Sequence, residues 1–441
     1  MKINSKTQNI TNDIFKKRRN QLIDMASDGV LIIPAMHSSI RNNDVDYEFR
    51  QDSSFWYFSG FEEPDAVMVL DGKSKKKYTM FVNPYDPDMA IWVGARVGAK
   101  GIEEDFGADK GISINKLKEK LYEITEQHER IYYSFGDDPI IDPIIKDILI
   151  KRRQSSDRRN KNPLEIKDPS PLINEMRLIK SKEEINLIQT AIDITEKGFL
   201  KAMQFTKHDK NEFEIQAVLE YEFRAGGSKR NGYPSIVASG SNACTLHYIE
   251  NNSILKNSEL LLIDAGAEFN YYTADITRTW PIKGIFDKEQ RAIYEIVLEA
   301  QKKSIEIIKP GVPIAMIHQK ALEIIVQGLI DLKILNDTKE NILENKDYID
   351  YFMHGTSHWL GIDVHDVGNY KQNNKSTILK PGMVFTVEPG IYFGENIKNI
   401  PQKYKNIGIR IEDNILVTES SHKILSNNIP KEITDIERIL K

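Results

Sequence analysis

Apolar residues recur at helical spacing in several segments of the chain. The clearest of these segments follows Ser181, which forms a capping box with Glu184, and it continues with Ile185, Ile188 and Ile192. This pattern predicts a helix that begins directly after Ser181. Helical patterns of the same kind cover residues 15–26, 114–127, 212–223, 288–308 and 315–332.

Short apolar runs bounded by glycine and proline predict strands between these helices. The first third of the chain therefore reads as mixed α/β, with strands at residues 29–34, 66–70, 78–82 and 130–134, the middle two forming a hairpin. Two later runs resemble each other, because residues 261–266 (LLIDAG) and 385–390 (FTVEPG) each end in a carboxylate and then a glycine. This resemblance suggests a domain of two related halves that each place an acid at a strand end.

A shift in composition marks the predicted domain boundary. Residues 151–171 (KRRQSSDRRNKNPLEIKDPSP) are charged, contain proline and hold almost no apolar residues, which is typical of a linker or an exposed loop. We therefore expect an N-terminal α/β domain over residues 1–174, with its linker at about 151–174, and a second domain over 175–441. No nucleic-acid-binding motif accompanies the basic run, so we read it as solvated.

Composition narrows the classes of function. The 441 residues carry 60 Lys and Arg against 65 Asp and Glu, a net charge of −5, which disfavours nucleic-acid binding through bulk charge. The single cysteine, Cys244, excludes sulfur-rich zinc sites, and any metal must be held mainly by oxygen and imidazole. The polar first residues contain no secretory signal, and no apolar run reaches the roughly 18 residues of a membrane span. We expect a cytoplasmic protein.

Five polar residues interrupt or end the apolar strands predicted in the second domain, and they form the candidate chemical site. They are Asp264, Asp275, His358, Glu388 and Glu412. Asp275 stands out because it is predicted within a strand, where a bare carboxylate is costly to bury. Four clustered carboxylates repel one another unless cations lie between them, so two divalent ions are expected. Oxygen ligands with one nitrogen suit Mn²⁺, Co²⁺, Fe²⁺ or Zn²⁺ better than copper, and a pair of such ions can activate water as a nucleophile.

The motifs around these residues give a family resemblance that runs nearly end to end. The chain resembles aminopeptidase P (Xaa-Pro aminopeptidase), a proline-specific group of the pita-bread metallopeptidases. The matching motifs in the second domain are NACTLHY (242–248), LLLIDAGAEFNYYTADITRTWP (260–281), HGTSHWLGIDVHDVG (354–368), TVEPGIY (386–392) and GIRIEDNILVT (408–418). FRQDSSFWYFSGF (49–61) and WVGAR (92–96) match in the first domain. The resemblance implies an α+β chain with an N-terminal α/β domain and a C-terminal pita-bread catalytic domain with pseudo-twofold halves.

The resemblance also implies roles for single residues. The five metal ligands are the residues of the candidate site, with Asp275 and Glu412 bridging two divalent ions, Mn²⁺ being favoured, and Glu388 acting as the general base. The residues that contact the substrate are His247 and His365 at its carbonyl oxygen, His354 and Arg410 at the proline side, and Tyr392 near the metals. In the family a neighbouring subunit reaches toward the site, for which Asp44 and Trp92 are the candidates, so a homodimer or homotetramer is expected.

The implied reaction is release of the first residue from peptides with proline in the second position, by attack of a hydroxide that bridges the metals. The bond before proline has no N–H, so a mechanism that does not grip this hydrogen is needed. Prolidase, which cleaves Xaa-Pro dipeptides on the same scaffold, stays open as the alternative, as does a pita-bread binding protein without catalysis. A cysteine nucleophile at Cys244 is disfavoured, because no third catalytic partner is apparent.

Overall fold

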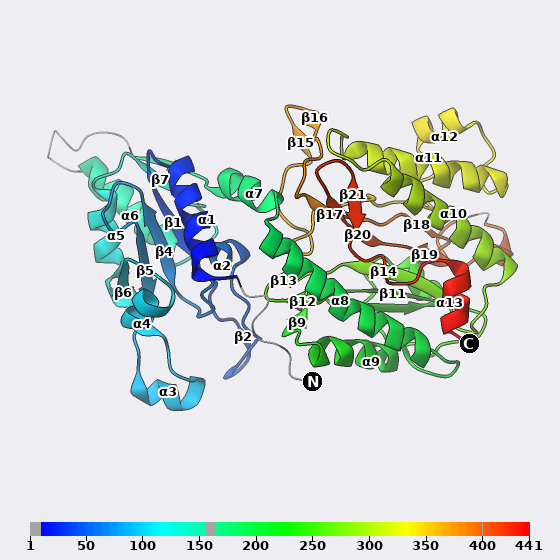
Figure 1. Cartoon of the computed structure of the whole chain (residues 1–441), viewed down its shortest axis with the longest axis horizontal. Helices are drawn as coiled ribbons and strands as arrows, with labels where there is room; N and C mark the ends of the chain where they lie inside the picture. The colour runs from blue at the N-terminus through cyan, green and yellow to red at the C-terminus, as the bar shows by residue number, and fades with distance from the viewer. Residues whose placement is uncertain (1–9, 155–163, 399) are drawn as a thin grey trace. The chain divides into compact units, whose positions relative to one another are not determined.

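The computed structural model describes residues 10–154, 164–398 and 400–441. The chain divides into two compact units, of which the first ends at Met176 and the second runs from Arg177 to Lys441. Figure 1 labels the elements of both units. No helix in the described ranges is long and apolar enough to cross a membrane.

The N-terminal unit is built on one mixed sheet of six strands in the order β6-β5-β4-β1-β7-β8. The central strand β1 runs antiparallel to β4 and parallel to β7, and its residues are almost all buried. The strands are β1 (Val30–Pro34), β4 (Val67–Asp71), β5 (Tyr78–Val82), β6 (Lys110–Ser113), β7 (Arg130–Tyr132) and β8 (Glu165–Lys167). The predicted hairpin is confirmed as the antiparallel pair β4 and β5.

Helices and one small hairpin complete this unit. The hairpin consists of β2 (Ile40–Asn42) and β3 (Val45–Asp46), both fully exposed. The helices are α1 (Asn12–Met25), α2 (Ser53–Ser59), α3 (Pro87–Val93), α4 (Gly98–Asp105), α5 (Leu117–Thr125), α6 (Ile141–Gln154) and α7 (Ser170–Leu178). The two helices predicted from periodicity are confirmed as α1 and α5, the latter preceded by a 3₁₀ turn at Ile114–Lys116.

The segment predicted as an exposed linker holds regular structure where it is described. Lys151 lies in the last turn of α6, and residues 155–163 are outside the described ranges. Strand β8 pairs in parallel with β7 at the edge of the sheet, and Arg130 Nε donates to Glu165 Oε2 at 2.7 Å. A three-residue edge strand with one half-buried residue, Ile166, has no apolar pattern long enough to be seen in a charged sequence.

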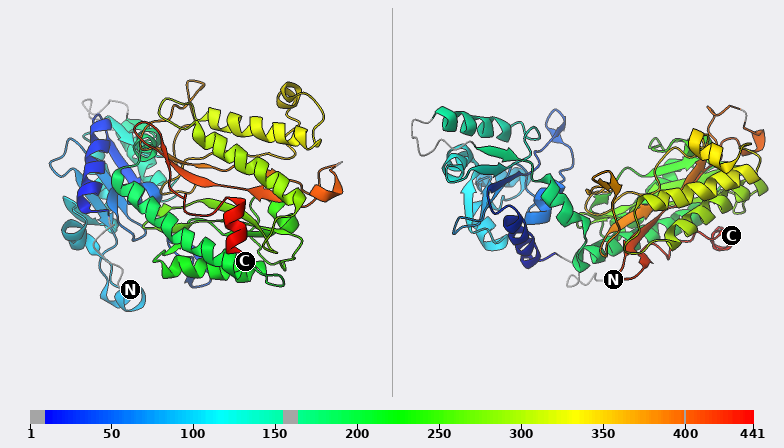
Figure 2. Two further views of the ribbon diagram at one scale, coloured as in Figure 1. Left: turned by 45° about the vertical axis from the view of Figure 1, so that its right-hand side comes forward. Right: turned by 90° about the horizontal axis from the view of Figure 1, so that it is seen from above.

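Long helices flank the strands of the C-terminal unit. These helices are α8 (Lys182–Phe205), α9 (Glu212–Ala225), α10 (Lys288–Glu306) and α11 (Ala315–Asp331), followed by the short α12 (Lys339–Asn345) and α13 (Ile433–Ile439). The capping box of Ser181 and Glu184 is present at the start of α8, and all four predicted helices are confirmed. Helix α8 packs beside α9 and α10 beside α11, as Figures 1 and 2 show.

The strands of the C-terminal unit form several small antiparallel sheets. One sheet holds β10 (Ile236–Ser239), β11 (Leu260–Ala265) and β14 (Ile276–Pro281), and another holds β17 (Val384–Val387), β20 (Asp413–Val417) and β21 (His422–Ile424). The remaining strands are β9 (Arg230–Asn231), β12 (Ala267–Phe269), β13 (Tyr272–Thr273), β15 (Lys371–Gln372), β16 (Lys375–Ser376), β18 (Gly390–Tyr392) and β19 (Gly408–Arg410). The two similar sequence runs form β11 and β17, in different sheets, as the prediction of two halves requires.

Candidate active site

Two aspartates meet because β11 and β14 pair in an antiparallel register. Asp264 lies opposite Thr277, and Asp275 directly precedes β14. The intervening chain must pass very close to residue 274, because a Cβ on Gly266 would lie only 1.8 Å from the Ala274 carbonyl oxygen. Glycine is therefore the residue that permits this approach. As a result the carboxylates face one group, the hydroxyl of Tyr233.

Three of the acids lie at interruptions between strands. Asp275 stands between β13 and β14, Glu388 between β17 and β18, and Glu412 between β19 and β20. The prediction that Asp275 lies within a strand is therefore wrong, and the apolar pattern of residues 408–418, which reads as one strand, forms two strands. The break arises because β19 pairs with β18 whereas β20 pairs with β17, so the chain changes sheets at Glu412.

Backbone contacts across the two halves hold these interruptions in place. Glu412 N donates to the Thr277 carbonyl at 3.0 Å, and Asp275 N donates to Asn414 Oδ1 at 3.1 Å. The Asn414 amide also donates back to the Asp275 carbonyl, so one side chain clasps both polar groups of that peptide. The acids are thus positioned by strand pairing and by this clasp.

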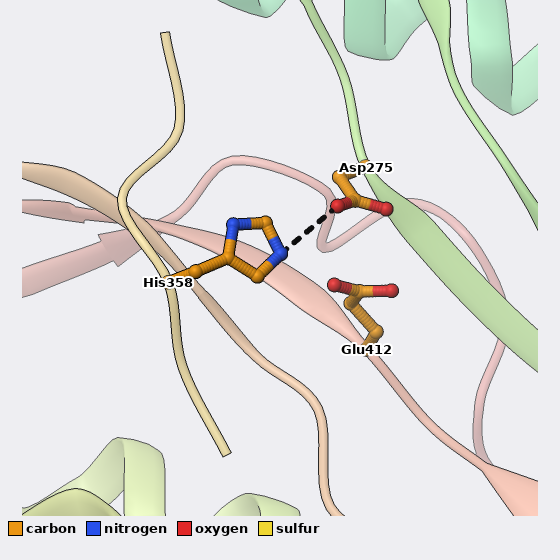
Figure 3. Close-up of side chains that lie close together, drawn as sticks. All are labelled: Asp275, His358 and Glu412. Carbon is orange, nitrogen blue, oxygen red and sulfur yellow. Dashed lines mark ion pairs between the residues drawn. The ribbon is translucent and has the colours of Figure 1, made fainter. Parts of the chain in front are cut away.

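Asp275, His358 and Glu412 offer ligand atoms that all lie within 4.8 Å of one another. Figure 3 shows the His358 ring facing the Asp275 carboxylate, with the Glu412 carboxylate alongside, the three coming from separate segments. His358 Nε2 lies 3.1 Å from Asp275 Oδ2 and 3.4 Å from Glu388 Oε1. Its Nδ1 lies 3.1 Å from the Trp359 carbonyl, an arrangement that leaves Nε2 as the ligand atom. Two or three carboxylates with one imidazole form a donor set that suits a hard divalent cation.

Electrostatics at the acids agree with a cation site. Burial, followed by the neighbouring carboxylates, raises the pKa of Glu412 well above its usual range. Burial also raises the pKa of Glu388 to about 7, with His358 opposing the shift and Asp275 adding to it. Burial opposes the charge of His358, yet Asp275 and Glu388 raise its pKa to about 9. A proton and a metal ion compete for such groups, so a bound cation would offset the cost of burying these carboxylates in charged form.

A second network joins Arg410 to the acids. Arg410 Nη2 donates to Asp264 Oδ2 at 2.6 Å, and Nη1 donates to the Tyr392 hydroxyl at 2.9 Å. His354 Nε2 lies 2.8 Å from the same hydroxyl. Burial and then the charge of Arg410 lower the pKa of His354 to about 3, so its imidazole is neutral at pH 7. The structure therefore brings these three predicted substrate residues together beside Asp264.

The acids open into a cavity of about 570 Å³. Both histidines predicted at the substrate carbonyl line it, and the His365 ring lies 4.3 Å, centroid to centroid, from that of His358. None of the lining residues comes from the N-terminal unit. The other two predicted residues belong to that unit, where Asp44 lies exposed in the turn between β2 and β3 and Trp92 is 83% exposed on α3.

Sequence patterns missed three residues that organise the site. The Tyr233 hydroxyl lies 2.7 Å from Asp264 Oδ1 and 2.6 Å from Asp275 Oδ1. The Thr277 hydroxyl donates to Glu412 Oε2 at 2.7 Å, and Asn414 forms the clasp described above. Tyr233 lies dozens of residues before its partners, and no local spacing signals such a contact. Thr277 and Asn414 each lie two residues after a predicted ligand, and this closeness is the sequence signal that could have found them.

Two family models match the chain. Metallopeptidase family M24 covers residues 186–419, and the N-terminal domain of aminopeptidase P covers residues 15–132. Among curated relatives, the Xaa-Pro aminopeptidase of Haemophilus influenzae is 42% identical, over 97% of this chain and 96% of the relative. The Xaa-Pro aminopeptidase of Escherichia coli is 37% identical, over 98% of each chain.

Solved structures agree with these relatives. The aminopeptidase PepP of Pseudomonas aeruginosa has a TM-score of 0.94 at 37% identity and covers 98% of both chains. Zinc-substituted aminopeptidase P of Escherichia coli, in complex with product, has the same TM-score at 37% identity, over 98% of this chain and 99% of that one. The resemblance predicted from the motifs is confirmed, and the chain belongs to metallopeptidase family M24, with the N-terminal domain of aminopeptidase P.

Proposed function

We propose that the chain is an Xaa-Pro aminopeptidase, which releases the first residue from peptides with proline in the second position. The observation that carries the proposal is the group formed by Asp275, His358 and Glu412 at the base of a cavity. Full-length similarity to Xaa-Pro aminopeptidases supports this activity over that of a prolidase. The intact ligand set argues against a binding protein without catalysis.

Five residues would hold two divalent metal ions in this proposal. They are Asp264, Asp275, His358, Glu388 and Glu412, of which Asp275 and Glu412 would serve both ions. When bound, the ions would supply Lewis-acid activation of water and of the scissile carbonyl. We favour Mn²⁺, because the donors are mostly hard oxygens, with Co²⁺, Fe²⁺ or Zn²⁺ as alternatives.

Glu388 moves the proton that the reaction requires. Its Oε2 lies 3.8 Å from His354 Nδ1, and its Oε1 accepts from the Thr386 hydroxyl at 3.2 Å, so the carboxylate is held beside the cavity. The carboxylate takes a proton from the attacking water and delivers it to the leaving nitrogen. With this proton the nitrogen leaves as the secondary amine of proline, and no step requires an N–H on the scissile bond, which a bond before proline lacks.

The other cavity residues bind the substrate. His247 and His365 donate to the carbonyl oxygen as negative charge develops on it. Neutral His354, with Arg410 and Tyr392, forms the wall on the proline side. The hydrogen bonds from Arg410 to Tyr392 and Asp264 keep this wall rigid beside the metal ligands.

We also propose that the working protein is a homodimer or homotetramer in which Asp44 and Trp92 reach the cavity of a neighbouring subunit. Helix α3 supports this, because none of its residues is buried and Ile91 and Trp92 are each 83% exposed. Large apolar patches of this kind mark interaction surfaces. Light scattering tests the proposal, since Trp92→Asp should lower the oligomeric mass, and an unchanged mass contradicts it.

We place the enzyme in the cytoplasm, where peptides are recycled and a lone half-buried thiol, Cys244, stays reduced. Fractionation of cells that express the tagged chain tests this location. Recovery in a membrane or secreted fraction contradicts it.

The decisive assay compares three peptides with the purified chain. We expect release of arginine from Arg-Pro-Pro, little release from Arg-Ala-Pro, and weaker cleavage of the dipeptide Arg-Pro. A chelator should stop the reaction and added Mn²⁺ should restore it. Cleavage of the dipeptide alone would make the chain a prolidase, and no cleavage with Mn²⁺ present would overturn the proposed function.

A further inference from the structure

Glu212 is a fully buried carboxylate outside the metal site. It is the first residue of α9, and its relative exposure is 0%. Capping of this helix is carried out by Asn211 and Glu214, which form the capping box, so the Glu212 side chain is not needed for it. A buried carboxylate is costly unless it is well hydrogen-bonded, which raises the question of what this one holds.

Five donors surround the carboxylate. Oε1 accepts from Ser239 N at 2.6 Å, Ser239 Oγ at 2.7 Å and Asn242 Nδ2 at 3.0 Å. Oε2 accepts from the Tyr248 hydroxyl at 2.8 Å and Ser253 N at 2.9 Å. This number of donors saturates a carboxylate, and all of them come from residues 239–253.

The two oxygens hold this segment on either side of His247. The Oε1 partners precede His247 in the chain and the Oε2 partners follow it, beginning with the adjacent Tyr248. Residues 245–253 belong to no helix or strand, and their backbone makes single hydrogen bonds, such as that from Glu212 N to the Ser253 carbonyl at 2.9 Å, in place of a continuous ladder. Among the described residues, nothing hydrogen-bonds the His247 ring itself. The position of this ring at the cavity therefore depends on the path of the segment.

One turn further along the same face of α9, Gln216 also binds a residue of this segment. Gln216 Oε1 accepts from Asn251 Nδ2 at 2.9 Å. Asn251 in turn accepts from Val237 N at 2.9 Å and donates to the Ser235 carbonyl at 2.8 Å. Asn251 has φ 48°, a left-handed conformation that asparagine tolerates well. Side chains on one face of α9 thus fix both ends of the segment.

We propose that Glu212 is a positioning residue for the reaction: its carboxylate, by binding residues on both sides of His247, sets the place of that imidazole at the substrate carbonyl. The inference rests on the role proposed for His247. It predicts that Glu212 affects turnover only through His247 and leaves the metal site unchanged.

A double-mutant cycle tests this dependence. Glu212→Gln keeps the shape of the side chain but turns one acceptor into a donor that faces other donors. We expect the variant to lower kcat on Arg-Pro-Pro about tenfold or more with little change in KM, since small displacements of a catalytic group are costly. In a His247→Ala background the same substitution should cost less than about twofold, because coupled residues are not additive.

The matched control is Glu214→Gln, the same substitution two residues along the same helix. Glu214 lies in the capping box and pairs with Lys210, away from residues 239–253. We expect this control to keep wild-type turnover. Metal analysis of all variants should give the wild-type content. An equal loss of kcat with and without His247, or loss of metal in Glu212→Gln, overturns the proposal.

Hydrogen exchange measures the positioning without any assay of activity. Peptides that cover residues 239–253 should exchange faster in Glu212→Gln than in wild type and in Glu214→Gln, with peptides around Asp275 and Glu412 unchanged. Unchanged exchange over residues 239–253 overturns the inference. If wild type releases no residue from Arg-Pro-Pro, the proposed function fails, and this exchange experiment still decides whether Glu212 holds the segment.

A second variant serves if Glu212→Gln does not fold. Tyr248→Phe removes one hydrogen bond to the carboxylate, next to His247, and keeps the ring. We expect a loss of kcat of about threefold that disappears in the His247→Ala background. Wild-type kcat for Tyr248→Phe, together with wild-type exchange over residues 239–253, contradicts the proposal.

Discussion

The acids and the substrate histidines of this site are positioned in different ways. Asp275 and Glu412 lie between paired strands, where Glu412 N donates to the Thr277 carbonyl and Asn414 clasps the Asp275 peptide. His247 and the second substrate histidine instead lie on irregular segments held by buried side chains from elsewhere in the fold. Strand pairing thus holds the acids proposed to bind metal, and side-chain anchors hold the two histidines proposed at the substrate carbonyl.

The second histidine, His365, is held in place by ion pairs of the residue next to it. Its neighbour Asp366 is buried and accepts from Arg177 Nη2 at 2.6 Å and Lys180 Nζ at 2.9 Å. Burial opposes ionisation, yet Lys180 and Arg177 hold the pKa of Asp366 below its usual value. Gly361 permits this packing, because a Cβ there would lie 2.1 Å from Asp366 Oδ2. Segments without strand pairing therefore depend on single buried contacts, and substitutions at these contacts separate substrate positioning from metal binding.

The largest effect on turnover is expected at the acids proposed to bind metal. Asp275→Ala removes a shared metal ligand, and turnover on Arg-Pro-Pro should fall to less than about one-thousandth. Asp275→Asn is the shape-matched control and should fail similarly, because an amide does not supply the negative charge. Retention of more than a few per cent of wild-type turnover would contradict the ligand assignment.

A smaller loss of turnover is expected at His365, which lies on an irregular segment. His365→Ala removes one donor to the developing oxyanion, and kcat should fall about a hundredfold. Circular dichroism and metal content should stay at wild-type values, since the His365 side chain is not a proposed ligand. Loss of metal in this variant would assign His365 to the metal site instead.

The ionic anchor should give a mixed effect. Asp366→Asn removes the carboxylate paired with buried Lys180 and leaves Arg177 with Asp363, so the free energy of unfolding should fall by about 3 kcal/mol. Denaturation in urea measures this change. Turnover should also fall, by about tenfold, because the adjacent His365 is displaced. If the variant is destabilised but keeps full turnover, Asp366 does not position His365.

The smallest effect is expected far from the site. Ser181→Ala removes the N-cap of α8, where Ser181 Oγ accepts from Glu184 N at 3.4 Å, and should cost about 1 kcal/mol of stability. Because this cap touches neither the acids nor the histidines, kcat should not change. A fall in kcat would show that helix stability, and not local positioning, controls the site.

Much of the site could be predicted because its acids end apolar strands within distinctive motifs. Asp264 and Glu388 directly follow such runs, and capping boxes and helical periodicity in the sequence predict the helices. The anchors could not be predicted in this way. Glu212 looks like any acid in the first turn of a helix, and Arg177 meets its partner 189 residues later. Such contacts depend on tertiary packing, which local spacing does not encode.

The interruptions between strands were also beyond sequence patterns. The apolar residues of 408–418 are typical of one continuous strand. The spacing of apolar residues does not show that the chain changes its pairing partner at Glu412. The charged edge strand β8 was missed for a related reason, because three residues carry too little pattern. Both errors concern hydrogen-bonding partners, whereas Arg410 and Glu412, both named from the sequence as site residues, do line the cavity.

The most direct test of this account is metal analysis of wild type, Asp275→Ala and His365→Ala, purified side by side with Mn²⁺ and assayed on Arg-Pro-Pro. The account predicts two ions per chain in wild type and in His365→Ala, and fewer in Asp275→Ala, with turnover impaired in both variants. Wild-type metal content in Asp275→Ala, or loss of metal in His365→Ala, would contradict the division between acids that bind metal and histidines that contact the substrate.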